Sequence, residues 1–265
     1  MPTVNSNIAA KYALNNLTKT DRELTSAMER LSSGKRINHA GDDAAGAAIS
    51  DRMTSQIKGL EQSARNAADV VDEMVEVQRR YNTGFINFYD DNFTLRRNRV
   101  MDIAEEILRR NVNIEWKCEG RVDSVDVDML RLMRKAGCRV VSYGVESANP
   151  ETLSLLRKDI TIEQAEAAFA ATREAGLRSL AYMILGAPGE DAKAVQHSID
   201  FCRQIGASYV QFSTLSAMPG TPLFANHTPT HSVTNPLDTD QARPTVTDMD
   251  PAILGKMVRQ AWTGF

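Results

Sequence analysis

The sequence has few cysteines, no long apolar run and no excess of positive charge, and each absence excludes a class of protein. Three cysteines in 265 residues are too few and too scattered for a disulfide framework, which favours a reducing compartment. No apolar run approaches the roughly 18 residues that a membrane span needs, and the amino terminus lacks the pattern of a secretory signal. A formal net charge of -3 without a basic stripe predicts no nucleic-acid partner. We therefore expect a cytoplasmic protein.

Residues 1 to about 69 also lack Trp, Phe and Cys, and Tyr12 is their only aromatic residue. Their apolar residues recur at intervals of three and four, which is typical of a helix that packs against a partner helix. The first such seam consists of Leu17, Leu24, Met28 and Leu31. Gly34 is expected to end this helix, and the acidic pair at 42–43 to cap the next one.

A second apolar seam runs from residue 49 to residue 74 and crosses residue 69 without a break. The sequence therefore predicts one continuous helix from about residue 44 to residue 80.

After Tyr81, short apolar runs rich in β-branched or aromatic residues alternate with amphipathic helices. We expect strands at 85–89, 114–118, 139–144, 178–185 and 208–213. Thr161 with Gln164 forms a capping-box pattern, and glycines stand where three helices should end, at 137, 176 and 206. This alternation predicts a parallel sheet with right-handed crossovers, either open or barrel-like.

The carboxy-terminal part is rich in Thr, Pro, Asn and Asp over residues 225–250, and we expect a loop or disordered excursion there. A short terminal helix should follow Asp250. Because the chain stops at Phe265 with little to cover this apolar end, we expect a truncation.

Four motifs in the first segment occur in one order. They lie at residues 5–10, 27–38, 42–46 and 52–57. Together they closely resemble the amino-terminal segment of bacterial flagellin. The resemblance implies a coiled-coil hairpin of two helices that, in flagellin, packs against a carboxy-terminal helix and neighbouring subunits. No flagellin-like carboxy-terminal helix is found in this sequence.

Seven short motifs follow one another at the expected strand ends. They are DDNFT at 90–94, WKC at 116–118, GRVD at 120–123, AGC at 136–138, GVES at 144–147, GAPGE at 186–190 and PGT at 219–221. In this order they resemble a radical S-adenosylmethionine (radical SAM) enzyme of the B12-binding type. The resemblance implies an α/β fold, here a truncated (β/α) partial barrel of about five parallel strands, with the cofactor at the carboxyl ends of the strands. We expect a helical hairpin at 1–69, the partial barrel at 70–224, and a polar linker with a terminal helix at 225–265.

The resemblance assigns S-adenosylmethionine contacts to residues that follow strands. These residues are Asp90, Asp91, Asn92, Arg121, Glu146, Ser147, Gly186 and Glu190. The two aspartates would pair with the sulfonium or the ammonium group. The alternative is a polar turn in which Asn92 caps the next helix.

The other assignments have structural alternatives as well. Glu146 and Ser147 would hydrogen-bond to the ribose or the amine. Gly186 would let the backbone approach the adenine, but a tight turn with Glu190 or Asp191 as a helix cap has the same pattern. Arg121 would bind a carboxylate or form a surface ion pair.

The family's [4Fe–4S] cluster is not expected in this sequence. Such enzymes begin with a strand and a Cys-x-x-x-Cys-x-x-Cys loop, whose three thiolates hold the cluster. Here Cys118 is expected to end a strand, Cys138 to precede the next strand at the opposite edge of the sheet, and Cys202 to lie in a helix. We expect the three thiols not to converge, no other metal site, and no radical activity of the isolated chain. The sequence leaves a cobalamin cofactor undecided.

Two functions from different classes follow. The first is a chimera whose radical SAM core binds S-adenosylmethionine but is inactive alone. The second is a flagellar structural or interaction protein, exported to the flagellum and in contact with flagellar subunits. In both cases we expect self-association, through the helical seam and through an exposed edge strand at 85–89.

Overall fold

The structure is a computed structural model that describes residues 8–34, 44–216, 220–226, 231–234 and 242–264. The chain forms two compact units, Met1–Ser63 and Ala64–Phe265. Among the described residues, no helix is both long enough and apolar enough to cross a membrane.

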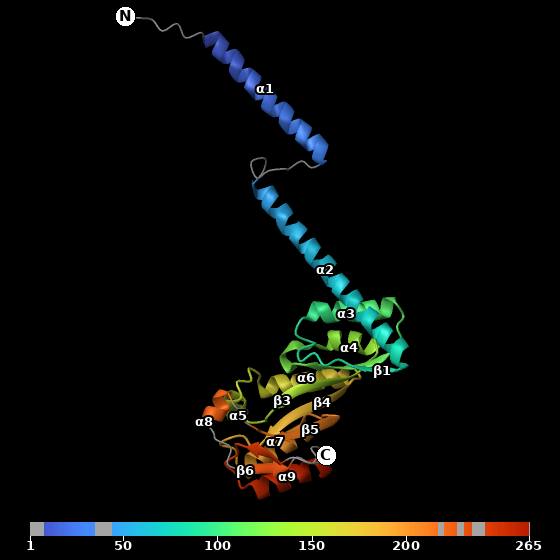
Figure 1. Cartoon of the computed structure of the whole chain (residues 1–265), viewed down its shortest axis with the longest axis vertical. Helices are drawn as coiled ribbons and strands as arrows, with labels where there is room; N and C mark the ends of the chain where they lie inside the picture. Colours follow the sequence, from blue (N-terminus) through green and yellow to red (C-terminus); the bar gives the residue numbers. More distant parts are fainter. Residues whose placement is uncertain (1–7, 35–43, 217–219, 227–230, 235–241, 265) are drawn as a thin grey trace, which may run out of the picture. The chain divides into compact units, whose positions relative to one another are not determined.

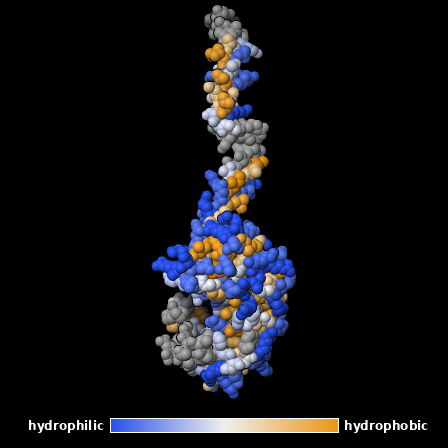
Figure 2. Space-filling view, turned by 90° about the vertical axis from the view of Figure 1, so that its right-hand side faces the viewer, coloured by the Kyte–Doolittle hydropathy of each residue, from blue (hydrophilic) through white to orange (hydrophobic). Residues whose placement is uncertain are grey.

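The first unit contains α1 (Ile8–Ser33) and the beginning of α2 (Ala44–Tyr81). Helix α1 ends where expected, because Gly34 takes a φ of +65° and donates its N–H to the Arg30 carbonyl at 3.0 Å. The expected continuous second helix is confirmed, and the acidic pair at 42–43 lies outside the described residues. The seam of α1 is uncovered, with Leu17 70% and Leu31 87% exposed (Figure 2).

The second unit is built on a parallel sheet in the order β1-β2-β3-β4-β5. The expected partial barrel of five parallel strands is confirmed. Its strands are β1 (Phe85–Asn87), β2 (Glu115–Gly120), β3 (Cys138–Glu146), β4 (Arg178–Leu185) and β5 (Tyr209–Thr214).

Helices lie between the strands in sequence and cover one face of the sheet (Figure 1). They are α3 (Arg97–Arg109), α4 (Val127–Lys135), α5 (Pro150–Leu155), α6 (Ile162–Glu174) and α7 (Ala192–Gln204), with a 3-10 turn at Val122–Ser124. Alternate residues of β2 and β4 are buried, as in a sheet with one covered face. The core on that face contains Trp116, Phe93 and Phe169.

The boundary signals of these helices are confirmed. Thr161 and Gln164 form a reciprocal capping box at the start of α6. Gly137, Gly176 and Gly206 follow α4, α6 and α7 with positive φ, which ends each helix in a conformation that glycine adopts without a Cβ clash.

The described segments of 225–250 correct the expectation of a loop or disordered excursion, whereas residues 227–230 and 235–241 lie outside the described residues. The strands β6 (His231–Thr234) and β7 (Ala242–Thr245) pair in antiparallel fashion, and α8 (Pro222–Asn226) precedes them. Helix α9 (Pro251–Gly264), expected from the sequence, packs beside β5 and α7 and buries Leu254 completely.

Candidate functional site

The carboxyl ends of β1 to β4 bring the sequence-predicted residues to one end of the sheet. Asp90, Asp91 and Asn92 follow β1, and Arg121 follows β2. Glu146 ends β3 and Ser147 follows it, whereas Gly186 and Glu190 lie in the turn after β4. The geometry at each strand end decides which of these groups are available to a ligand.

Glu190 is a buried carboxylate with four hydrogen-bond donors. Its Oε2 accepts the N–H groups of Gly186 and Ala187, at 3.0 and 3.1 Å. Its Oε1 accepts the hydroxyls of Ser147 and Thr152, at 3.1 and 2.8 Å. Glu190 therefore joins the turn after β4 to the segment after β3, and the helix cap of α7 is Asp191 instead. Because these bonds occupy both carboxylate oxygens, Glu190 has a structural role, in which it holds the turn after β4 and the segment after β3 in place.

The side-chain carboxylate of Glu146 lies beside Gly144, two residues earlier on β3. Glu146 takes a φ of +72° at a register shift between β3 and β4, and its carboxylate binds Lys158 Nζ at 2.8 Å. A Cβ on Gly144 would lie 2.6 Å from Glu146 Oε1 and 2.8 Å from Lys158 Nζ. Gly144 thus makes room for this ion pair, which is only partly exposed at the end of the sheet.

The remaining predicted residues are mostly engaged with neighbours. Arg121 forms a two-pronged ion pair with Asp123, at 2.9 and 2.8 Å, and its hydrogen bond holds the pKa of Asp123 below the usual range. Asp90 pairs with Arg99 at 3.1 Å and also accepts the Asn92 N–H.

Two residues of the first predicted motif stay accessible. Asp91 and Asn92 are exposed. Asn92 does not cap α3, since that helix begins only at Arg97 after an N-cap, Arg96, without a side-chain bond. The capping alternative for Asn92 is therefore wrong.

The face of the sheet opposite the helices carries polar residues that sequence reasoning missed. Tyr182 on β4 donates its hydroxyl to Glu119 on β2 at 3.0 Å, across β3. Burial, followed by the hydrogen bond to Glu119, raises the pKa of Tyr182. Ser142, paired with Glu119 in the sheet register, is 1% exposed, and its hydroxyl lies beside Tyr182 without completing a hydrogen bond among the described residues. The alternation of polar and apolar residues along β2 was the signal that could have found this face.

The cysteines partly contradict the expected separation of the thiols. Cys138 pairs with Trp116, which lies two residues before Cys118 on β2, so Cys138 and Cys118 lie on the same helix-covered face of the sheet. Burial, together with the adjacent Cys138 thiol, raises the pKa of Cys118 well above its usual value. Cys202 lies in α7, as expected, and burial raises its pKa to about 12.

These three thiols do not fit a [4Fe–4S] cluster. Each cysteine is 0% exposed, and the raised pKa values of Cys118 and Cys202 oppose the thiolate form that an iron cluster requires. Within the described ranges, no group of three His, Cys, Asp or Glu side chains is placed to hold a metal ion.

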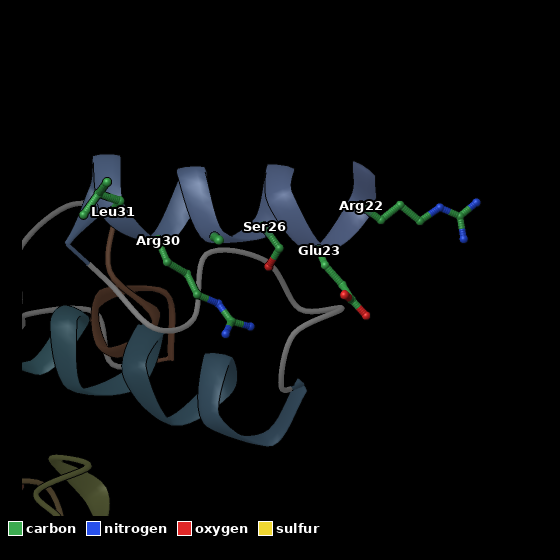
Figure 3. Close-up of a pocket in the computed structure, with 6 residues that line it drawn as sticks. Arg22, Glu23, Ser26, Arg30 and Leu31 are labelled. Atoms are coloured by element: carbon green, nitrogen blue, oxygen red, sulfur yellow. The ribbon is translucent and has the colours of Figure 1, made fainter. Parts of the chain in front are cut away.

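A hollow of about 760 Å³ beside α1 does not offer an alternative site. Glu23, Ser26 and Arg30 extend from one side of the helix, whereas Leu31 points elsewhere (Figure 3). Its described lining comes from α1 alone, and a single helix cannot enclose a small ligand.

The chain is similar to flagellin in its first part. The family model of the bacterial flagellin N-terminal helical region matches residues 4–83. A flagellin of Xenorhabdus nematophila is 61% identical over 66 residues, which are 25% of this chain and 21% of that protein.

The remainder is similar to another group of proteins. An uncharacterized methyltransferase of Pyrococcus horikoshii is 29% identical over 205 residues, or 74% of this chain and 44% of that protein. The chain therefore spans less than half the length of these relatives. The radical S-adenosylmethionine methyltransferase TsrM from Kitasatospora setae, solved with tryptophan substrate and a SAM analogue, has the same fold. Its TM-score is 0.55 at 24% identity, over 67% of this chain and 36% of that one. The Radical SAM superfamily model matches residues 53–202, which is more than half of the chain. The protein thus belongs to the radical SAM superfamily and carries a flagellin-like helical segment at its amino terminus.

Proposed function

We propose that the second unit binds S-adenosylmethionine at the carboxyl ends of its strands and does not assemble a [4Fe–4S] cluster, so that the isolated chain has no radical activity. The burial of all three thiols supports the absence of the cluster. Reductive cleavage of the sulfonium needs a low-potential electron donor, which these buried thiols cannot bind. We assign no residue of this chain to the binding of cobalamin.

The polar face of the sheet supports binding of the nucleoside. The Ser142 hydroxyl and Asn87 Oδ1 are buried without hydrogen-bond partners among the described residues, and a ligand rich in polar groups would satisfy them. Glu119, Tyr182 and Glu146 would then contact the ribose or the amine, with the exposed Asp91 near the ligand's positive end. When bound, S-adenosylmethionine supplies an electrophilic sulfonium carbon, and the residues named here would orient it.

Calorimetric titration with S-adenosylmethionine tests this site. Glu146→Ala and Asp91→Ala should each weaken binding, whereas Glu105→Ala, which removes an exposed carboxylate from α3, should not. Equal affinity in all three variants, or no binding by the unaltered chain, would reject the assigned site. Release of deoxyadenosine under reducing conditions would reject the predicted inactivity.

A second candidate function rests on the uncovered apolar seam of α1. Side chains that are 59–70% exposed, such as Leu24, Met28 and Leu17, favour docking against another helix. We propose that this segment self-associates or contacts flagellar subunits. Export by motile cells and entry into filaments would make this the primary function and the flagellum its location. Retention in the cytoplasm would favour the first.

A further inference from the structure

The free edge of β1 has main-chain groups without partners. The Glu115 N–H donates to the Gly84 carbonyl at 3.0 Å, and the Phe88 N–H donates to the Lys117 carbonyl at 2.9 Å. Because alternate residues of a strand face the same neighbour, Asn87 directs its N–H and carbonyl away from β2. Nothing in the described part of the chain pairs with them there.

The rest of this edge lacks the features that usually protect a sheet. Phe85 is 44% exposed, and its N–H and carbonyl both bond the Thr83 hydroxyl, at 3.2 and 2.9 Å. Strand β1 contains neither proline nor a charged residue, which are common guards of edge strands. At the other edge, α9 packs beside β5.

A groove of about 430 Å³ runs along β1 and is walled on its other side by α2. Its lining from α2 is Val70, Glu73, Met74 and Val77, and its lining from the strand side is residues 85–89. Asn87, which also lines the groove, contributes the outward N–H and carbonyl of its main chain. The groove therefore combines apolar walls with polar groups that an added backbone would satisfy.

The negative charges near the groove favour one kind of binding partner over another. Glu73 lies in the wall, and Asp91 lies just beyond the end of β1; both are exposed, and neither has an ion pair among the described residues. A second copy of this chain that offered its own edge segment would bring Asp90 and Asp91 toward these carboxylates, which is unfavourable and argues against the self-association that the sequence suggested for the edge strand at 85–89. A basic segment would be attracted.

We propose that this groove binds an extended basic segment of another polypeptide, which adds to β1 as a sixth strand. Main-chain bonds to Asn87 hold the segment, apolar side chains enter between β1 and α2, and its basic side chains meet Glu73 and Asp91. The groove lies at the edge of the sheet, and its proposed occupant shares only the side chain of Asp91 with the proposed S-adenosylmethionine site, so that Val77→Lys tests the groove without altering that site.

The test uses the full chain and a fluorescent heptapeptide, Lys-Val-Lys-Val-Thr-Val-Lys, whose alternation suits a strand with one apolar face. Fluorescence anisotropy at low salt should show saturable binding. Replacing the lysines by glutamates, or methylating the backbone nitrogens of the valines, should weaken binding at least about tenfold, because the first change reverses the charge and the second removes main-chain donors.

Four variants of the protein locate the peptide. Asn87→Pro removes the outward N–H and leaves the bonds to β2, and should weaken binding about tenfold. Val77→Lys fills the groove and should do the same. Val75→Lys is the matched control, because Val75 lies on the same helix outside the groove and is 40% exposed. Glu73→Lys should weaken the lysine peptide about threefold and strengthen the glutamate peptide.

Binding that is lost in Val77→Lys and kept in Val75→Lys supports the proposal, even if Asn87→Pro proves unstable by thermal unfolding. Absence of saturable binding, or equal effects of the two lysine substitutions, would overturn it. A dimer in light scattering that Val77→Lys disrupts would also overturn it, since the groove would then hold a second copy of the chain.

Discussion

Single residues of the candidate site are fixed mainly by contacts within the protein. Glu190, Glu146, Arg121 and Asp90 all have partners from this chain, so their residue types alone do not distinguish a ligand contact from a structural bond. Gly144 shows the same point, because its missing Cβ leaves room for the Glu146–Lys158 pair. Only binding measurements on variants separate the two roles.

Replacing Glu190 tests the hydrogen-bond network behind the site. Glu190→Ala leaves two N–H groups and two hydroxyls without their acceptor and should lower the free energy of unfolding by about 3–5 kcal/mol. Glu190→Gln should cost only about 1–2 kcal/mol, because the Ser147 and Thr152 hydroxyls can rotate to accept from the amide. Urea unfolding measures both, with Glu105→Ala as the control. Equal costs of the two substitutions would contradict the compensation by the amide, and a cost of Glu190→Ala no larger than that of Glu105→Ala would show that the network is unimportant.

Acid should destabilise the protein partly through Glu106. A hydrogen bond from Arg109, supported by Arg110 and opposed by burial, lowers the pKa of Glu106 from 4.5 to about 2. Since the folded-state pKa is the lower one, the stabilisation is complete above pH 4.5 and is lost as the pH falls toward 2. Unfolding followed across this range should show a smaller loss in Glu106→Gln. An unchanged slope in the variant would contradict the assignment.

At the scale of elements, the ends of helices and strands could be predicted from the local sequence, whereas the pairing register of the strands could not. The strand expected at 178–185 was predicted in full, because its apolar residues are continuous, and the capping box of α6 was visible in two residues. The pairing of β6 with β7 was missed, since both strands are short and polar. The contact between Cys118 and Cys138 depends on the pairing register of β2 with β3, which no local pattern reveals. Glu119 and Tyr182 were missed because alternation does not say which face the helices cover.

The turn after β4 depends on its packing against α9. A Cβ on Gly186, whose φ is +77°, would lie 2.4 Å from Leu254 Cδ2. Gly186→Ala should therefore cost about 2–4 kcal/mol of unfolding free energy, from backbone strain and overpacking. Gly189→Ala is the matched control, because its φ is +84° but nothing lies within 4 Å, and it should cost about 1–2 kcal/mol. Chemical denaturation of both variants, with and without Leu254→Ala, measures the contact. If Leu254→Ala does not reduce the cost of Gly186→Ala, the contact is not the cause.

The whole molecule combines a radical SAM half-barrel with a flagellin-like helical segment through one continuous helix. The two family models overlap over residues 53–83, all but the last two of which lie within α2. We propose a functional boundary near residue 69, where the sequence resemblance changes. The join leaves the half-barrel with its helix-covered core intact, including the three buried thiols.

The central claim is that this chain has the fold of its superfamily without thiols able to hold its cluster. Anaerobic reconstitution of the purified chain with iron and sulfide, followed by desalting and assay of both elements, tests this most directly. Because Cys118, Cys138 and Cys202 are buried within the core, we expect no stoichiometric iron and no brown chromophore. Four irons and four sulfides retained per chain, lost when these cysteines are replaced by alanine, would contradict the account.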